Sequence, residues 1–376
     1  METTANGPAG RIARLRALMD ERGYDAVVVR DEANLRWLTG ATGVFDYTFE
    51  FPHAAFITDD ACYLHTDSRY FNSFEENLPE GHPWKLDMDG HDIPGWVAER
   101  AAENRCRVVA VEDDMQVRFY RGIERGLEDR SVAASLPLMH GDIQRMRAVK
   151  DEDEIALMRR AQAITDAAFA HMCGFIRPGL TEKEIRTELE NFMFSNGADG
   201  LAFDSIVASG PNTANPHAIP SDRVVEVGDF VLMDYGARYR DYRSDMTRTV
   251  VVGEPTDEQR ALYDLVRRTH EECVRAIHAG VDGKEVFDLS RKIIGDAGYG
   301  AYYDHGLGHG VGIDIHEEPR FGRTSNTVEE GAVITVEPGV YLPGVGGVRL
   351  EDYGVVTKDG YEPFTQSSHD LVVIEV

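Results

Sequence analysis

The sequence predicts an α+β protein, in which an N-terminal α/β unit is followed by a larger unit of helices packed on antiparallel strands. Helix-like and strand-like segments alternate over the first 140 residues. A long amphipathic segment then begins near Asp151 and runs to the Pro-Gly pair at 178–179, where a helix would end. Two later segments, 228–252 and 331–357, have the strand–turn–strand pattern of a hairpin.

The N-terminal domain is expected to span residues 1–142, and the second domain residues 143–376. Apolar residues at helical spacing predict a first helix over 11–22, ending at Gly23. Short runs of β-branched and aromatic residues indicate strands, and two further stretches have helical spacing. The strands are expected at 25–29, 53–58, 62–66 and 107–112, and the helices near 68–77 and 116–128.

Two helices of the second domain are marked by capping boxes. Thr181 with Glu184 forms one, and Thr256 with Gln259 forms the other. In each pair the Thr side chain and the side chain three residues later satisfy each other's backbone N–H groups, which closes the first turn. Helices are therefore predicted to begin at these two positions.

Composition excludes several classes of protein. The formal net charge of −27 is spread along the chain and would repel the phosphate backbone of a nucleic acid. No run approaches the ~18 consecutive apolar residues of a membrane span. The first residues, METTANGPAGRIARLR, lack the apolar core of a secretory signal, so a cytoplasmic location is expected. Buried free thiols, not a disulfide framework or a zinc ribbon, are expected for the four widely spaced cysteines, Cys62, Cys106, Cys173 and Cys273.

The hairpin at 228–252 places one carboxylate at the inner end of each of its strands. Asp234 ends the strand-like run FVLMD, and Asp245 precedes the returning run MTRTVVV. The two residues lie symmetrically about the middle of the turn, so they are predicted to face each other with Cβ atoms ~5 Å apart. Two carboxylates that close repel each other unless a proton or a cation lies between them.

The hairpin at 331–357 repeats this arrangement, because Glu337 and Glu351 lie on either side of a turn centred on Gly344. Taken singly, an Asp before a turn or a Glu before Pro is an ordinary solvated residue, so the pattern alone leaves both interpretations open. Four carboxylates with one or two imidazoles would make an oxygen-rich site that suits two divalent metals, Mn²⁺ or Co²⁺ more naturally than a Cys-rich zinc site.

Residues 305–319, HGLGHGVGIDIHEEP, contain three histidines and four glycines. By itself the stretch fits a metal site, a phosphate loop or a glycine-rich strand with incidental histidines. A phosphate loop is disfavoured because the glycines lack the G-x-G-x-x-G spacing and no P-loop lysine follows. Beside a metal cluster, the glycines would give the backbone room for close approach.

Together these motifs resemble the signature of the pita-bread metallopeptidases. MDYGARYRDYRSDMTRT, HGLGHGVGIDIHEEP, ITVEPGVY and GVRLED occur in order, and NPHAIPSDRVVEVGD, ANLRWLTGATG and TDSRY also match. Within that superfamily the chain is most similar to the Xaa-Pro peptidases, prolidase and aminopeptidase P, which are close relatives of creatinase. The resemblance implies a C-terminal pita-bread domain and a creatinase-like N-terminal α/β domain that restricts the substrate and contributes oligomer contacts.

The resemblance also implies five metal ligands and two divalent ions, with Mn²⁺ favoured and Co²⁺, Zn²⁺ or Fe²⁺ as alternatives. Asp234 would chelate one metal, while Asp245 and Glu351 would bridge both ions. His309 and Glu337 would complete the shell of the second metal. None of the five is replaced, which argues against a non-catalytic member of the fold.

Four further residues are implied around the substrate. His217 and His316 resemble the pair that faces the substrate carbonyl and stabilises the tetrahedral intermediate. His305 resembles a residue that lines the pocket beyond the scissile bond, and an ordinary hydrogen-bonded histidine is the alternative. Arg349 lies on the same strand face as Glu351 and would hold a ligating carboxylate or Tyr341.

The implied activity is hydrolysis of the bond between an N-terminal residue and proline, in Xaa-Pro dipeptides or longer Xaa-Pro peptides. A hydroxide bridging the two metals would attack the carbonyl, and Glu337 would pass a proton to the proline nitrogen. The alternative is a pita-bread hydrolase acting on another small amide or amidine, such as creatine or a cyclic amide, and a non-catalytic peptide-binding protein ranks below it. The family also implies a homodimer or larger homo-oligomer. Dipeptidase and aminopeptidase preferences stay open at this point.

Overall fold

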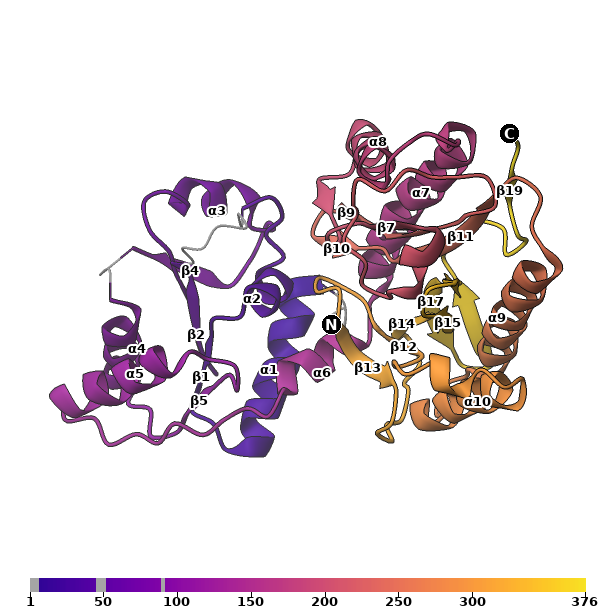
Figure 1. Cartoon of the computed structure of the whole chain (residues 1–376). Helices are drawn as coiled ribbons and strands as arrows, with labels where there is room; N and C mark the ends of the chain where they lie inside the picture. The colour runs from indigo at the N-terminus through magenta and orange to yellow at the C-terminus, as the bar shows by residue number, and fades with distance from the viewer. Residues whose placement is uncertain (1–6, 45–51, 89–91) are drawn as a thin grey trace. The chain divides into compact units, whose positions relative to one another are not determined.

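A computed structural model of the chain describes residues 7–44, 52–88 and 92–376. The chain forms two compact units that divide between Arg147 and Ala148 (Figure 1). Helix α6 (Asp142–Ala148) spans both this division and the boundary expected from the sequence. Each unit combines helices with strands, so the predicted α+β class is confirmed.

The N-terminal unit is built on a five-stranded mixed sheet in the order β4-β3-β2-β1-β5. The central strand β1 (Ala26–Val29) is buried along its whole length, as expected for a run of four apolar residues. It pairs antiparallel with β2 and parallel with β5. The other strands are β2 (Ala54–Thr58), β3 (Cys62–His65), β4 (Trp84–Asp87) and β5 (Val109–Val111).

All four strands and all three helices predicted for the described part of this unit are present. Its helices are α1 (Gly7–Arg22), α2 (Glu32–Thr39), α3 (Phe71–Asn77), α4 (Ile93–Glu103) and α5 (Val117–Asp129). Helices α2 and α4 and strand β4 were not predicted. A readable signal existed for α2, because the Asp31 side chain caps the helix by accepting from Asn34 N at 2.8 Å.

The C-terminal unit packs two helix pairs against two main sheets (Figure 1). Its helices are α7 (Glu152–Phe175), α8 (Glu182–Ser195), α9 (Asp257–Ala276) and α10 (Gly283–Asp296), with 3-10 turns η1 (Gly210–Ala214) and η2 (Gly300–Tyr302). Capping boxes begin α8 at Thr181 and α9 at Thr256, as predicted. A third box, between Asp151 and Glu154, begins α7.

One main sheet has the order β19-β11-β8-β7, and its apolar face packs on α7 and α8. The other has the order β13-β12-β14-β17-β18, and it shares a core with α9 and α10. The strands of the first are β7 (Ile206–Ser209), β8 (Phe230–Tyr235), β11 (Met246–Val252) and β19 (Val373–Ile374). Those of the second are β12 (Gly308–Gly310), β13 (Glu317–Phe321), β14 (Val333–Val336), β17 (Asp352–Thr357) and β18 (Gly360–Pro363). Small sheets add β6 (Gly200–Leu201), β9 (Ala237–Tyr239), β10 (Tyr242–Arg243), β15 (Gly339–Leu342) and β16 (Gly346–Arg349).

The first acidic hairpin (residues 230–252) corrects one prediction. Asp234 pairs with Thr247, not with Asp245, so the two aspartates do not lie directly opposite each other. The turn is formed by Arg240 and Asp241, whose φ angles are 46° and 73°, and its centre lies one residue later than predicted. Moving the centre by one residue moves the pairing by two, and Asp245 therefore stays on the same face as Asp234.

The second acidic hairpin (residues 333–357) keeps the predicted register. Val336 pairs with Asp352, and Gly339 pairs with Arg349, so Glu337 and Glu351 lie opposite each other between these pairs.

The described cysteines are all free thiols, as expected. Cys62, Cys106 and Cys273 are buried as predicted, whereas Cys173 is only half-buried. Among the described residues, no helix is both long enough and apolar enough to span a membrane.

Candidate metal centre and substrate pocket

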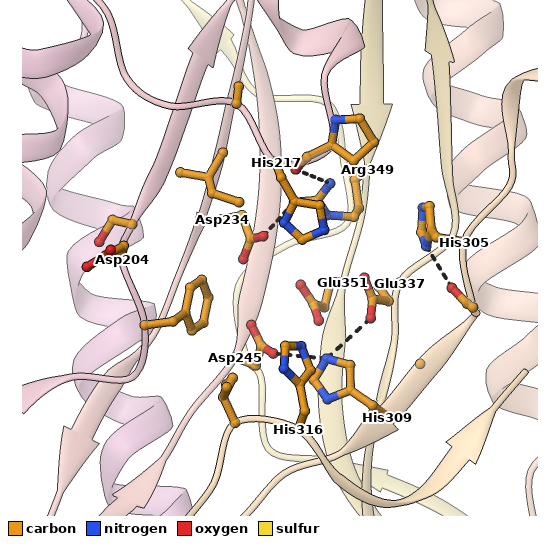
Figure 2. A pocket seen from close by; sticks show the side chains of 18 of the residues that line it. Asp204, His217, Asp234, Asp245, His305, His309, His316, Glu337, Arg349 and Glu351 are labelled. Atoms are coloured by element: carbon orange, nitrogen blue, oxygen red, sulfur yellow. Dashed lines mark hydrogen bonds and ion pairs between the residues drawn. The ribbon is translucent and has the colours of Figure 1, made fainter.

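The residues predicted to act at one site lie together in the C-terminal unit. They line a single cavity of about 630 Å³, and Figure 2 shows carboxylates from both acidic hairpins and imidazoles from other segments directed into it. His309 Nε2 lies 3.6 Å from Asp245 Oδ2 and 3.4 Å from Glu337 Oε1. Ligand atoms of Asp245, His309 and Glu351 all lie within 4.8 Å of one another.

The four carboxylates come from strand ends or from the links beside them, whereas His309 is the middle residue of β12. Asp234 lies near the end of β8, and Asp245 immediately precedes β11. Glu337 and Glu351 occupy the links between β14 and β15 and between β16 and β17. Strand ends suit a metal site because the paired strands fix the backbone that carries each side chain.

His309 is placed by close packing of the backbone around it. A Cβ atom at Gly308 would lie 2.0 Å from the Thr335 carbonyl oxygen, and one at Gly310 would lie 2.2 Å from that of Glu318. Only glycine fits at either position. The glycines of the HGLGHGVG stretch therefore let β12 pass between its neighbours and carry the histidine into the cavity.

Two threonines, which the sequence analysis missed, orient the ligands. Thr247 Oγ1 donates to Glu351 Oε2 at 2.6 Å. Thr335 Oγ1 accepts from His309 N at 3.0 Å and lies 3.4 Å from Glu337 Oε1. A signal was available, because Thr247 and Thr335 are each two residues from a predicted ligand and so share its strand face.

Arg349 braces the site with three donor atoms. Its Nη2 lies 2.5 Å from Asp234 Oδ2, and its Nε donates to Thr247 Oγ1 at 2.9 Å. Its Nη1 donates to the Tyr341 hydroxyl at 2.9 Å. The residue thus holds both groups considered for it from the sequence, a carboxylate and Tyr341.

The side chains carry an excess of buried negative charge. Burial, followed by repulsion from Glu351, raises the pKa of Asp245 well above its usual range. Burial, followed by repulsion from Glu337, does the same to the pKa of Glu351. Burial also raises the pKa of Glu337 to about 8, although Arg349 opposes the shift. Burial lowers the pKa of His309 to about 3, which leaves a neutral imidazole that can ligate a cation.

These residues fit divalent cations. Asp234 Oδ1 is buried and has no hydrogen-bond partner among the residues that the structure describes, so one candidate ligand atom in the site lacks a proton donor. A cation would supply that partner and relieve the repulsion among the carboxylates. Four carboxylates and one imidazole, with no thiolate, form a donor set suited to hard or borderline divalent ions.

Three more histidines line the same cavity. The His316 ring lies edge-on to that of His309, with centroids 4.4 Å apart. His217 is exposed on the opposite wall, next to Arg349 in Figure 2. His305 contributes from the side on which Tyr341 lies.

His305 is held by protein groups through both ring nitrogens. Its Nδ1 lies 2.7 Å from the Gly306 carbonyl oxygen and must donate to it, so Nε2 accepts from the Tyr341 hydroxyl at 3.1 Å. Tyr341 in turn accepts from Arg349. Burial lowers the pKa of His305 to about 4. The chain of hydrogen bonds fixes a neutral imidazole as part of the pocket wall.

A second cluster, formed by His270, Asp352 and His369, was not anticipated from the sequence. Asp352 Oδ2 lies 2.6 Å from His369 Nε2 and 3.5 Å from His270 Nε2. Arg248 Nη2 already pairs with Asp352 Oδ1 at 2.7 Å, and both side chains are buried. A single carboxylate neutralised by a buried guanidinium is a poor site for a second divalent charge, so this cluster is assigned a structural role.

Comparisons with known proteins agree with this geometry. Residues 156–358 match the model of metallopeptidase family M24, and residues 11–149 match the creatinase/prolidase N-terminal domain. A Xaa-Pro dipeptidase of Pyrococcus horikoshii is 32% identical over 365 residues, which cover 96% of this chain and 98% of the relative.

Solved structures give the same result. The Xaa-Pro dipeptidase from Bacillus anthracis matches with a TM-score of 0.89 and 36% identity, over 98% of this chain and 100% of that one. The X-Pro aminopeptidase from Thermotoga maritima matches with a TM-score of 0.86 and 33% identity, over 97% and 100%. The family resemblance and two-domain architecture predicted from the sequence are confirmed. The chain belongs to metallopeptidase family M24 and carries the creatinase/prolidase type of N-terminal domain.

Proposed function

We propose that this protein is a metal-dependent exopeptidase that hydrolyses the bond between an N-terminal residue and proline. The observation that carries the proposal is the single cavity that contains five metal-ligand side chains together with His217 and His316. Relatives that cover almost the whole chain are named for Xaa-Pro peptides, as dipeptidases and as an aminopeptidase.

Two divalent ions would be held by five side chains, those of Asp234, Asp245, His309, Glu337 and Glu351. When bound, such ions supply Lewis-acid activation of a water nucleophile and of the scissile carbonyl. The oxygen-rich donor set favours Mn²⁺ or Co²⁺, with Zn²⁺ and Fe²⁺ as alternatives.

The protein's own groups would bind the substrate and move the proton. Glu337 would take up a proton at a carboxylate oxygen during the reaction and pass it to the departing proline nitrogen. His217 and His316 line the cavity and would donate hydrogen bonds to the oxygen of the reacting carbonyl. His305, fixed by Tyr341 and Arg349, would bound the pocket beyond the scissile bond.

The apolar part of the cavity suits a proline ring. The bond before proline has no N–H, so recognition depends on shape and on apolar contact. The cavity supplies such surfaces through Phe203, Ile206, Pro216, Ile219 and Phe321.

The test is hydrolysis of Ala-Pro, Ala-Pro-Pro and creatine by metal-reconstituted protein. Cleavage of at least one peptide is expected, and cleavage of neither would contradict the proposal. The ratio of the two peptide rates separates a dipeptidase from an aminopeptidase. Hydrolysis of creatine alone would favour the small-amidine alternative.

We further propose that the N-terminal domain limits substrate length and contributes oligomer contacts, and that the enzyme is a cytoplasmic homodimer or larger homo-oligomer. Light scattering coupled to gel filtration measures the assembly directly. A monomer at micromolar concentration would contradict this part of the proposal without affecting the chemistry.

A further inference from the structure

Glu182, at the start of α8, is a buried carboxylate with an unusual set of partners. Its side chain is fully buried, with 0% exposure. Within the described ranges, no lysine or arginine lies within ion-pair distance of it. A carboxylate in such a place is costly unless several donors satisfy it. The donors all come from one segment, residues 209–221.

The two carboxylate oxygens bind opposite ends of that segment. Oε1 accepts from Ser209 N at 2.7 Å, from Ser209 Oγ at 2.8 Å and from Asn212 Nδ2 at 3.0 Å. Oε2 accepts from Ser221 N at 2.9 Å and from Ser221 Oγ at 2.6 Å. Hydrogen bonds to an ionised acceptor are stronger than those to a neutral one. One side chain therefore closes the base of the loop.

The closed loop forms a wall of the substrate cavity. Five consecutive residues line it, namely Pro216, His217, Ala218, Ile219 and Pro220. Within the part of the chain that the structure describes, no group hydrogen-bonds the His217 imidazole. The position of this ring is therefore set by the loop backbone.

The middle of the loop is tied to the metal centre. Arg349 Nη1 donates to the Pro216 carbonyl oxygen at 3.3 Å, and the same guanidinium binds Asp234. Gly347 N donates to Thr213 Oγ1 at 2.7 Å. With its base closed by Glu182 and its middle held by Arg349, the loop has one fixed path past the cavity.

We propose that Glu182 is a positioning residue for catalysis, which holds the loop 209–221 so that His217 lies at the reacting carbonyl. The inference rests on the proposed function of His217. It deepens that function by assigning the placement of the imidazole to a carboxylate that touches neither substrate nor metal.

The test begins with E182Q. Glutamine keeps the size of the side chain, but its NH₂ group cannot accept from the Ser221 N–H, so one end of the loop is released. The kcat for Ala-Pro hydrolysis is expected to fall on the order of tenfold to a hundredfold, with little change in KM. Hydrogen exchange of the amides in 210–220 should accelerate, while exchange in α7 stays unchanged.

E184Q is the matched control. Glu184 lies two residues further along the same helix, is exposed, and accepts from Thr181 N in the capping box, a role that glutamine also fills. Wild-type kcat and wild-type exchange of the loop are expected. If E182Q is too unstable to purify, S221A removes one hydroxyl donor from the same end of the loop and should shift both readouts in the same direction by less.

A double-mutant cycle with H217A separates positioning from general stability. Because Glu182 acts through His217, E182Q should cause no further loss of kcat in the H217A background. Losses that multiply would overturn the proposal, and so would an E182Q variant with wild-type kcat. Failure of the wild-type protein to cleave either peptide would instead contradict the proposed function, and the exchange measurement would still show whether Glu182 closes the loop.

Discussion

The two acidic hairpins present the same chemistry through different turns. In the second acidic hairpin, the turn is centred on Gly344, whose φ of 76° is allowed for glycine, and Glu337 faces Glu351. In the first acidic hairpin, the residues with left-handed φ angles at the turn are Arg240 and Asp241. Neither residue type predicts a turn centre from sequence as strongly as glycine does. In both hairpins, symmetry about the turn correctly predicts which strand face carries the carboxylates. It predicts which residues pair across the strands only where a glycine marks the centre of the turn.

The hairpins also support each other. Thr247 of the first donates to Glu351 of the second, and Arg349 of the second binds Asp234 of the first. Arg349 and Thr247 are hydrogen-bonded as well. Each hairpin thus carries candidate ligands and also orients those of the other, so the proposed centre depends on both.

Removing a ligand from the first acidic hairpin should have the largest effect. D245N replaces a carboxylate by a neutral amide. One oxygen of that carboxylate lies within 4.8 Å of the ligand atoms of His309 and Glu351. Metal content should fall by at least one ion, and kcat/KM for Ala-Pro should fall roughly a thousandfold, as loss of several kcal/mol of metal-assisted stabilisation implies. Metal analysis and peptide assays measure both.

D204N serves as the control for that variant. Asp204 lines the same cavity but is not one of the five ligands. Wild-type metal content is expected. If D245N kept both its metal and its activity, the assignment of the centre would be wrong.

Breaking the link between the hairpins should have the second largest effect. R349K keeps the positive charge but cannot reach Asp234, Tyr341 and Thr247 together, because an ammonium lacks the planar fork. Metal affinity or activity should fall about tenfold to a hundredfold. Equilibrium dialysis and kinetics test this, and an R349K enzyme equal to wild type would show that the link is dispensable.

Metal affinity should rise with pH. The pKa of Glu337 is raised to about 8 in the metal-free protein, so below that pH a proton occupies the carboxylate and must leave before a cation binds. Affinity should increase by up to about tenfold per pH unit for each proton released, and Asp245 and Glu351, whose pKa values burial also raises, should add to the rise. His309, with a pKa of about 3, should contribute nothing between pH 6 and 8.

Calorimetry in buffers of different ionisation enthalpy measures the protons released on metal binding. A positive count at pH 6.5 that declines towards pH 9 is expected. Affinity that does not change between pH 6 and 8 would contradict the protonated carboxylate.

The smallest effect is expected from T247V, which keeps the shape of the side chain and removes the hydroxyl that joins Glu351 to Arg349. Loss of a buried hydrogen bond costs about 1–3 kcal/mol of stability, and metal affinity should weaken several-fold. Thermal unfolding with and without metal measures both.

T249V is its control, since Thr249 is a buried neighbour on the same strand whose hydroxyl, among the described residues, bonds only to the Arg349 backbone. It should lose stability without losing metal affinity. Equal metal affinities for the two variants would show that the Thr247 hydroxyl does not contribute to metal binding.

Much of this architecture is predictable because it depends on local patterns. Capping boxes at Thr181 and Thr256 and the buried run of β1 are decided within a few residues. The second acidic hairpin is symmetric about a visible glycine. The family motifs then allow the ligand set to be named before any distance is known.

The remainder depends on contacts between distant segments. The bond of Thr247 to Glu351 joins residues 104 positions apart, and that of Glu182 to Ser221 joins residues 39 apart. The cluster of His270, Asp352 and His369 likewise has no local signature. Such partners are chosen by the packing of the whole domain, which no short pattern encodes.

The central claim is that the two acidic hairpins together form one centre for two divalent ions. Titration of the metal-free protein with Mn²⁺, with bound metal counted by elemental analysis after dialysis, tests it most directly. We expect two bound ions per chain in the wild-type protein. D245N and E351Q, one variant from each hairpin, should each lose at least one ion. Retention of two ions by either variant, or fewer than two ions in the wild-type protein at saturation, would contradict it.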